Sequence, residues 1–383
     1  MEPVGLPIAF LEVTMAERII SADSHVDFSR DRVLANLPTQ YHDAYKESGM
    51  GMMRRMMEGK PQKQLKNKQA PAVENTTGPM PTEHPWEAAG RPGAYDPHER
   101  LKDMDLDKVD AEVLYCSATG GSEYYSLEPD ACLAAFQAFN SAAIEFASVN
   151  PDRLIPVYIL PLQDIEEATK ELQRIVNEGA RAIQLPLYPS DSDLAPYWDE
   201  VYDPLWSAIE EAGTPISQHV GSNEYLFNIM RRDPTPAKGI FQSLPPVFMA
   251  ETIASFIVPG VFQRHPKLKV VLVEAGLGWI PYYVGRLDKM VERHGWDQLG
   301  MNLPELPSHY WHQNMFASFE EDEFGIKNRH DLGVENLLWA TDYPHPDSTW
   351  PHSQEVIHEH FDNVPVEEMR LIIGGNAARI YQL

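Results

Sequence analysis

Short β-rich apolar runs, bounded by turn residues and separated by longer helical patterns, recur along the whole of this 383-residue chain. Apolar residues three and four apart indicate helices most clearly at 129–149, 164–178, 197–212 and 247–263. Eight strands that alternate with helices are typical of an α/β fold, and specifically of a (β/α)8 TIM barrel. The eight runs are residues 19–23, 111–116, 154–160, 180–185, 215–219, 268–274, 315–319 and 336–342.

The rival α/β architecture, a doubly wound open sheet, normally carries a glycine-rich phosphate-binding loop after its first strand. Here the first run is followed instead by Ser24, His25 and Val26, and then by a long stretch before the second run. We therefore predict a TIM barrel with a long insertion after strand 1. We assign residues 18–383 to this single domain, residues 1–17 to an N-terminal tail, and residues 28–97 to an insertion that forms a lid over the barrel mouth.

Charge and cysteine content exclude several classes of protein. Lys and Arg number 31 against 57 Asp and Glu, a formal net charge of -26, which repels nucleic acid and anionic membrane surfaces. The only cysteines are Cys116 and Cys132, too few for a disulfide framework, which favours the cytoplasm. No run approaches the roughly 18 apolar residues of a membrane helix. The expected partner is a small-molecule substrate.

Ionisable side chains stand at the ends of four of the predicted strands: Asp23 and His25, His219, Glu274, and Asp342. Parallel barrel strands all end at one face, where barrel enzymes place their catalytic groups. Side chains two apart on a strand project to the same side, so Asp23 and His25 are expected to bind one ion together. Imidazole and carboxylate ligands suit one divalent metal ion, with Zn²⁺ preferred and Mn²⁺ as the alternative.

This chain resembles the amidohydrolase superfamily, in particular the amidohydrolase-related branch that includes aminocarboxymuconate-semialdehyde and γ-resorcylate decarboxylases. The most specific motif is Thr341-Asp342-Tyr343-Pro344-His345. The resemblance spans most of the chain and implies a metal-dependent enzyme that forms a homo-oligomer, expected to be a dimer. The segments that carry it are residues 22–25, 91–93, 100–105, 265–269, 276–281, 286–288, 340–345 and 375–379.

Two departures from the family pattern bear on the mechanism. Many relatives carry His-x-His at strand 1, whereas this chain has Asp23-x-His25, closer to the Glu-x-His of some decarboxylases. The decarboxylases also have a histidine, expected to act as an acid or base, where this chain has Glu274. Glu274 is therefore expected either to ligate the metal or to transfer a proton itself.

Our first functional hypothesis is a hydrolase that attacks a small aromatic or carboxylated substrate with a metal-activated water. His25, His219 and one or both of Asp23 and Asp342 would hold the ion. Asp342 would accept the water's proton, and Glu274 would protonate the leaving group or complete the coordination, so that His219, Glu274 and Asp342 form the catalytic set. The alternative is a metal-dependent, non-oxidative decarboxylase of a small aromatic or unsaturated acid. A second alternative is a non-catalytic binding scaffold.

Aromatic residues near the predicted ligands suggest a flat, apolar substrate. Arg91, in the insertion, is a candidate for contact with an anionic group of the substrate. The candidate substrate-binding residues are Tyr188, Trp279, Tyr343, His345, Trp350 and Arg91.

Overall fold

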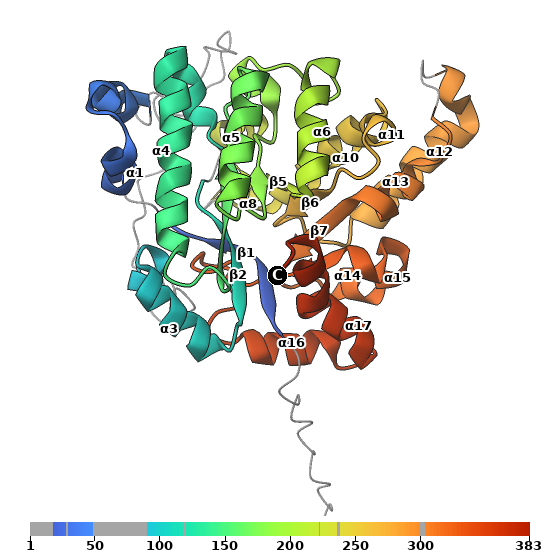
Figure 1. The fold of residues 1–383 in the computed structure, drawn as a ribbon. Helices are drawn as coiled ribbons and strands as arrows, with labels where there is room; N and C mark the ends of the chain where they lie inside the picture. The colour runs from blue at the N-terminus through green and yellow to red at the C-terminus, as the bar shows by residue number, and fades with distance from the viewer. Residues whose placement is uncertain are drawn as a thin grey trace, which may run out of the picture.

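The computed structural model describes residues 18–27, 30–48, 90–117, 120–221, 223–235, 238–298 and 303–383. Within them, eight parallel strands lie in one sheet in the order of the sequence, and helices cover its outside (Figure 1). The predicted (β/α)8 TIM barrel is thereby confirmed; each predicted run overlaps a strand, and the first strand extends two residues beyond its predicted end. The strands are β1 (Ile20–His25), β2 (Ala111–Tyr115), β3 (Leu154–Ile159), β4 (Ile183–Gln184), β5 (Ile216–His219), β6 (Val270–Val273), β7 (Met315–Phe319) and β8 (Leu337–Trp339).

The helices surround the strands as the apolar periodicity predicts. Two predicted helices differ from the structure because of proline and glycine. The 197–212 helix begins only at Asp203, with Pro204 in its first turn. The 247–263 helix is divided twice, at Met249 and again before Val261, where Gly260 takes a left-handed φ of 78°. The helices are α1 (Arg30–Asn36), α3 (Pro97–Asp107), α4 (Pro129–Ala147), α5 (Ile165–Asn177), α6 (Asp203–Ala212), α7 (Glu224–Arg232), α8 (Gly239–Ser243), α9 (Pro245–Phe248), α10 (Ala250–Ile257), α11 (Val261–Arg264), α12 (Ile280–Gln298), α13 (Pro307–Asn314), α14 (Glu323–Lys327), α15 (Arg329–Leu332), α16 (Ser353–Phe361), α17 (Val366–Arg370) and α18 (Asn376–Ile380).

Only part of the predicted insertion is described. Its first residues, including Val33, Leu37 and Tyr45, form a buried cluster with Phe136 and Phe139 of α4. This segment therefore packs on the outer layer of helices. The tail at 1–17 and residues 49–89 lie outside the described residues, so the lid stays a prediction, as does the homodimer. Among the described residues, no helix is both long and apolar enough to cross a membrane.

The barrel has a packed interior rather than a pore. Alternate residues such as Val113 and Tyr115 of β2 and Val271 and Val273 of β6 belong to one buried apolar cluster. The strands are buried on both faces, which explains why their sequences are nearly continuous apolar runs. Asp23, His25 and His219 lie in the last residues of their strands, and Glu274 and Asp342 follow theirs.

The first and last strands meet at a seam that side chains and loops close. Among the described residues no ladder pairs β1 with β8. Instead, the backbone N–H of Asp342 donates to the carbonyl of Asp23 at 3.0 Å, and that of His25 donates to the carbonyl of Tyr343 at 2.5 Å. At the same seam, the hydroxyl groups of Ser21, Ser24 and Thr341 lie within 2.9 to 3.1 Å of one another.

A buried ion pair joins α3 to β2. The Nε of Arg100 donates to Oε2 of Glu112 at 2.5 Å, and the two side chains are 0% and 3% exposed. Removing one partner of a buried pair leaves the other charge without compensation, which is usually far more costly than losing an exposed pair.

The substitution Glu112→Ala is expected to lower the free energy of unfolding by about 3–5 kcal/mol, because the Arg100 guanidinium would remain buried without its carboxylate. Urea unfolding followed by circular dichroism measures this change. The control is Lys102→Ala, which breaks the exposed pair between Lys102 and Glu99 on the same helix and should change the stability little. Equal stabilities for the two variants would contradict the prediction.

Candidate metal centre

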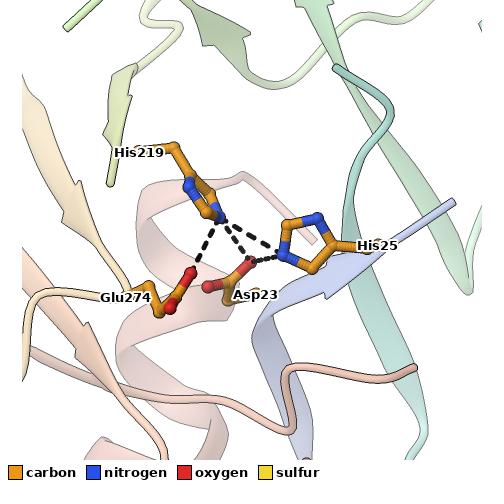
Figure 2. Close-up of side chains that lie close together, drawn as sticks. All are labelled: Asp23, His25, His219 and Glu274. Carbon is orange, nitrogen blue, oxygen red and sulfur yellow. Dashed lines mark hydrogen bonds and ion pairs between the residues drawn. The ribbon is translucent and has the colours of Figure 1, made fainter. Parts of the chain in front are cut away.

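The structure brings together four of the ionisable residues predicted at strand ends. Asp23 and His25 lie on β1, His219 is the last residue of β5, and Glu274 directly follows β6. Figure 2 shows their side chains turned toward one another at the carboxyl ends of the strands. One ligand atom from each residue can be chosen so that all four atoms lie within 4.8 Å of one another.

The distances within this group are those of a tight cluster of possible ligands. Oδ1 of Asp23 lies 3.4 Å from Nε2 of His25 and 3.5 Å from Nε2 of His219. The two Nε2 atoms are 3.3 Å apart, and Nε2 of His219 lies 3.7 Å from Oε2 of Glu274. The predicted convergence of Asp23 and His25 is thus observed.

Asp342 approaches the same ring nitrogen of His25. Its Oδ1 is 3.0 Å from Nε2 of His25 and 2.9 Å from Nδ1 of His345. The ring of His345 in turn lies over that of His25, with centroids 3.9 Å apart. His25, Glu274, Asp342 and His345 form a second, overlapping group whose ligand atoms lie within 4.8 Å. His345, predicted as a substrate contact, is therefore part of the ionisable cluster itself.

Two of these carboxylates are carried by backbone in the left-handed region. Both Glu274 and Asp342 have φ of 55°, which is uncommon for residues other than glycine. Local hydrogen bonds hold each conformation: the N–H of Glu274 donates to Oγ of Ser318 at 2.9 Å, and the N–H of His345 donates to the carbonyl of Asp342 at 2.9 Å. Strained conformations of this kind cluster at functional sites.

The ionisation of the cluster is far from that of exposed side chains. Burial, followed by the charge of Asp342, raises the pKa of Asp23 well above its usual value. Burial lowers the pKa of His25 to about 3, so its imidazole is neutral at physiological pH. Burial alone would raise the pKa of Asp342, but hydrogen bonds with His25 and His345 lower it to about 2.

These residues fit a divalent cation. Neither carboxylate oxygen of Asp23 has a hydrogen-bond partner among the described residues, and its side chain is 0% exposed. A buried carboxylate without partners is costly, and a bound cation would supply the missing interactions. The Nδ1 of His219 lies against the carbonyl of Val220, which favours a proton on Nδ1 and leaves Nε2 as a ligand.

Glu320 is a residue that the sequence interpretation missed. It directly follows β7, its Oε1 is buried, and this atom has no hydrogen-bond partner among the described residues. Burial, then the charges of Asp342 and Asp23, raise its pKa well above the usual value. The available signal was the same as for Glu274, a carboxylate immediately after an apolar run.

The remaining predicted substrate contacts make hydrogen bonds within the protein, and their role in binding stays a prediction. The hydroxyl of Tyr343 donates to Oδ2 of Asp103 at 2.6 Å, and Nε1 of Trp350 donates to the Asp103 carbonyl at 3.0 Å. Arg91 donates to the same Asp103 carboxylate. The further contacts are Tyr188 to the carbonyl of Phe248 and Trp279 to that of Ala275.

Comparison with known proteins identifies the family. A family model described as "Amidohydrolase" matches residues 23–383. The chain is 29% identical over 263 residues to 2-amino-3-carboxymuconate-6-semialdehyde decarboxylase of Dictyostelium discoideum, covering 66% of this chain and 67% of that protein. It is 25% identical over 274 residues to γ-resorcylate decarboxylase of Rhizobium sp. (strain MTP-10005), covering 64% and 76%.

A solved structure with a similar fold is 5-carboxyvanillate decarboxylase of Novosphingobium aromaticivorans, complexed with manganese and a nitrobenzoic acid. It has a TM-score of 0.68 and 17% identity, and covers 96% of this chain and 97% of that one. The chain belongs to the amidohydrolase family, as the sequence motifs predicted. This membership identifies it as an enzyme and disfavours the non-catalytic scaffold.

The substitution Asp23→Asn is expected to have opposite effects on the metal-free and metal-loaded protein. Relieving the repulsion at this buried carboxyl should stabilise the metal-free form, by about 1–2 °C in unfolding temperature for each kcal/mol in a chain of 383 residues. Loss of a ligand should weaken Mn²⁺ or Zn²⁺ binding by at least about 100-fold, more than the loss of a residue that only supports a ligand. Thermal unfolding with and without metal tests both effects, and unchanged metal affinity would refute the assignment of Asp23.

Proposed function

We propose that this chain is a metal-dependent decarboxylase that releases CO2, without oxidation, from a small aromatic or unsaturated carboxylic acid. The decarboxylase names of its relatives support this activity over our first hypothesis of hydrolysis. The observation that carries the proposal is the difference in exposure between the side chains of the cluster. Asp23 and His219 are buried, 0% and 4% exposed, whereas the Glu274 side chain is 28% exposed.

We assign the divalent ion to Asp23, His25, His219 and Asp342. Two imidazole nitrogens with carboxylate oxygens suit Zn²⁺, and the manganese in a protein of similar fold supports Mn²⁺ as well. A bound ion would offset the buried negative charge and hold the substrate's carboxylate and a neighbouring oxygen. The imidazole of His25, neutral at physiological pH, can ligate without first losing a proton to solvent.

Decarboxylation requires an acid more than it requires a base. The bond between the carboxylate carbon and the substrate breaks, its electron pair stays on the substrate carbon, and CO2 leaves. A proton must then reach that carbon. Hydrolysis instead needs a group that removes a proton from water. The two reactions therefore make different demands on the same residues.

Glu274 is suited to donate this proton. Burial raises its pKa well above the usual value, even though the nearby His219 acts in the opposite direction, so Glu274 holds its proton more tightly than an exposed glutamate does. Its partial exposure allows the proton to be replaced from solvent after each turnover. It occupies the position where the decarboxylases it resembles are expected to have a histidine.

The direct test is CO2 release from carboxyl-labelled hydroxybenzoic acids and related unsaturated acids. The purified enzyme should release label when loaded with Mn²⁺ or Zn²⁺, lose this activity after chelation, and regain it on reloading. The Asp23→Asn variant is the control for metal-independent release. Turnover of esters, lactones or amides by the loaded enzyme, with no CO2 from any acid, would instead support hydrolysis.

The substitution Glu274→Gln preserves size and removes the proton. It should lower kcat for decarboxylation by about 100- to 10,000-fold while leaving metal affinity within a few-fold of wild type. Glu274→His should retain much more activity, because an imidazole can also donate a proton. Steady-state kinetics and metal titrations measure both quantities. A large loss of metal affinity in Glu274→Gln would show that Glu274 is mainly a ligand.

A further inference from the structure

The proposed ligands straddle the seam of the barrel. Asp23 and His25 come from β1, and Asp342 follows β8. Because no ladder joins these strands among the described residues, other contacts must fix the distance between the two sides. Residues 91–93 and 100–105, which the resemblance singled out, lie beside this seam, and the proposed chemistry gives them no role.

Arg100 of α3 holds the β1 side. Its buried guanidinium donates from Nη1 to the carbonyl of His25 at 2.8 Å and to that of Gly93 at 3.2 Å. Its Nε is paired with Glu112 of β2, as described above. The same guanidinium lies over the ring of Tyr343, with Cζ 4.2 Å from the ring centroid. One buried cation thus contacts both a proposed ligand's backbone and the residue that follows Asp342.

Tyr343 links the two sides directly. Its carbonyl accepts the N–H of His25 at 2.5 Å, and its ring is buried, 1% exposed. Its hydroxyl donates to Oδ2 of Asp103 at 2.6 Å. Because Tyr343 adjoins Asp342 in the chain, a displacement of its ring would move the left-handed backbone that aims the Asp342 carboxylate.

Asp103 is fixed from three directions. Its carboxylate accepts Nε of Arg91 at 3.0 Å as well as the Tyr343 hydroxyl, and its carbonyl accepts the indole N–H of Trp350. The Arg91 guanidinium lies 4.7 Å from the Trp350 ring centroid. Gly93 packs so closely here that a Cβ would collide with the Asp103 carboxylate and the Tyr343 hydroxyl. These contacts fix the position of the Asp103 side chain, and with it the Tyr343 hydroxyl.

We infer that Arg100, Asp103 and Tyr343 are positioning residues that hold the β1 and β8 sides of the metal centre at their working separation. Arg100 and Tyr343 contact the backbone of His25, and Tyr343 contacts both Arg100 and Asp103. None of the three needs to touch metal or substrate. This inference rests on the proposed metal centre. Residues that orient ligands typically change metal affinity by about 10- to 100-fold when they are replaced.

The test uses Tyr343→Phe, which removes only the hydroxyl and leaves the ring beneath Arg100. The matched control is Tyr202→Phe, since the buried Tyr202 also donates one hydrogen bond, to the carbonyl of Ala195 at 2.8 Å, outside the seam network. A second variant, Gly93→Ala, disturbs the Tyr343 and Asp103 pair without removing either group. The readouts are the Mn²⁺ dissociation constant, the visible spectrum of the Co²⁺-loaded protein, and the unfolding temperature in excess chelator.

Tyr343→Phe and Gly93→Ala should raise the dissociation constant by about 10- to 100-fold and alter the Co²⁺ spectrum. Tyr202→Phe should lower the unfolding temperature without changing the affinity or the spectrum. Wild-type affinity and spectrum in both seam variants would overturn the inference while leaving the proposed metal centre intact. If the wild-type protein binds no divalent ion, the metal centre itself fails, and this inference fails with it.

Discussion

Negative charge buried at the open end of the barrel is the constraint on which the site depends. Asp23 is fully buried, and among the described residues neither of its carboxylate oxygens has a hydrogen bond; Asp342 lies beside it across the seam. Uncompensated charge in a poorly solvated site is costly, so such a cluster persists only with protons or a cation. Protonation is favoured because burial raises the pKa of Asp23 and of Glu274. A cation is favoured because the clustered imidazole and carboxylate groups suit metal ligation.

The seam explains how residues from opposite ends of the chain come to share one ion. A barrel whose strands follow sequence order must close by bringing its first strand to its last. At that junction the backbone donors of His25 and Asp342 are satisfied by Tyr343 and Asp23 rather than by a regular ladder. Because no regular ladder fixes the two strands at this point, the positions of the Asp23 and Asp342 carboxylates depend on contacts with side chains of α3.

The strands and the proposed ligands could be predicted because both follow from simple burial. A barrel strand buried on both faces must be apolar, so an ionisable residue such as His219 or Asp342 marks its end. Glu320 also stands directly after a buried apolar strand. The sequence did not single it out, because three further acidic residues follow it. The left-handed backbone of Glu274 and the pairing of Arg91 with Asp103 could not be predicted, because tertiary contacts impose them.

An acid-rich mouth also constrains how an anionic substrate binds under the proposed function. Without a cation, a substrate carboxylate would meet the ionised Asp342 and be repelled. A divalent ion reverses the sign of that interaction and gives the carboxylate a direct partner. Arg91 does little to provide the missing positive charge, because its guanidinium is paired with the Asp103 carboxylate. Metal and substrate should therefore bind synergistically, and the same carboxylates that demand a cation would make acid recognition depend on it.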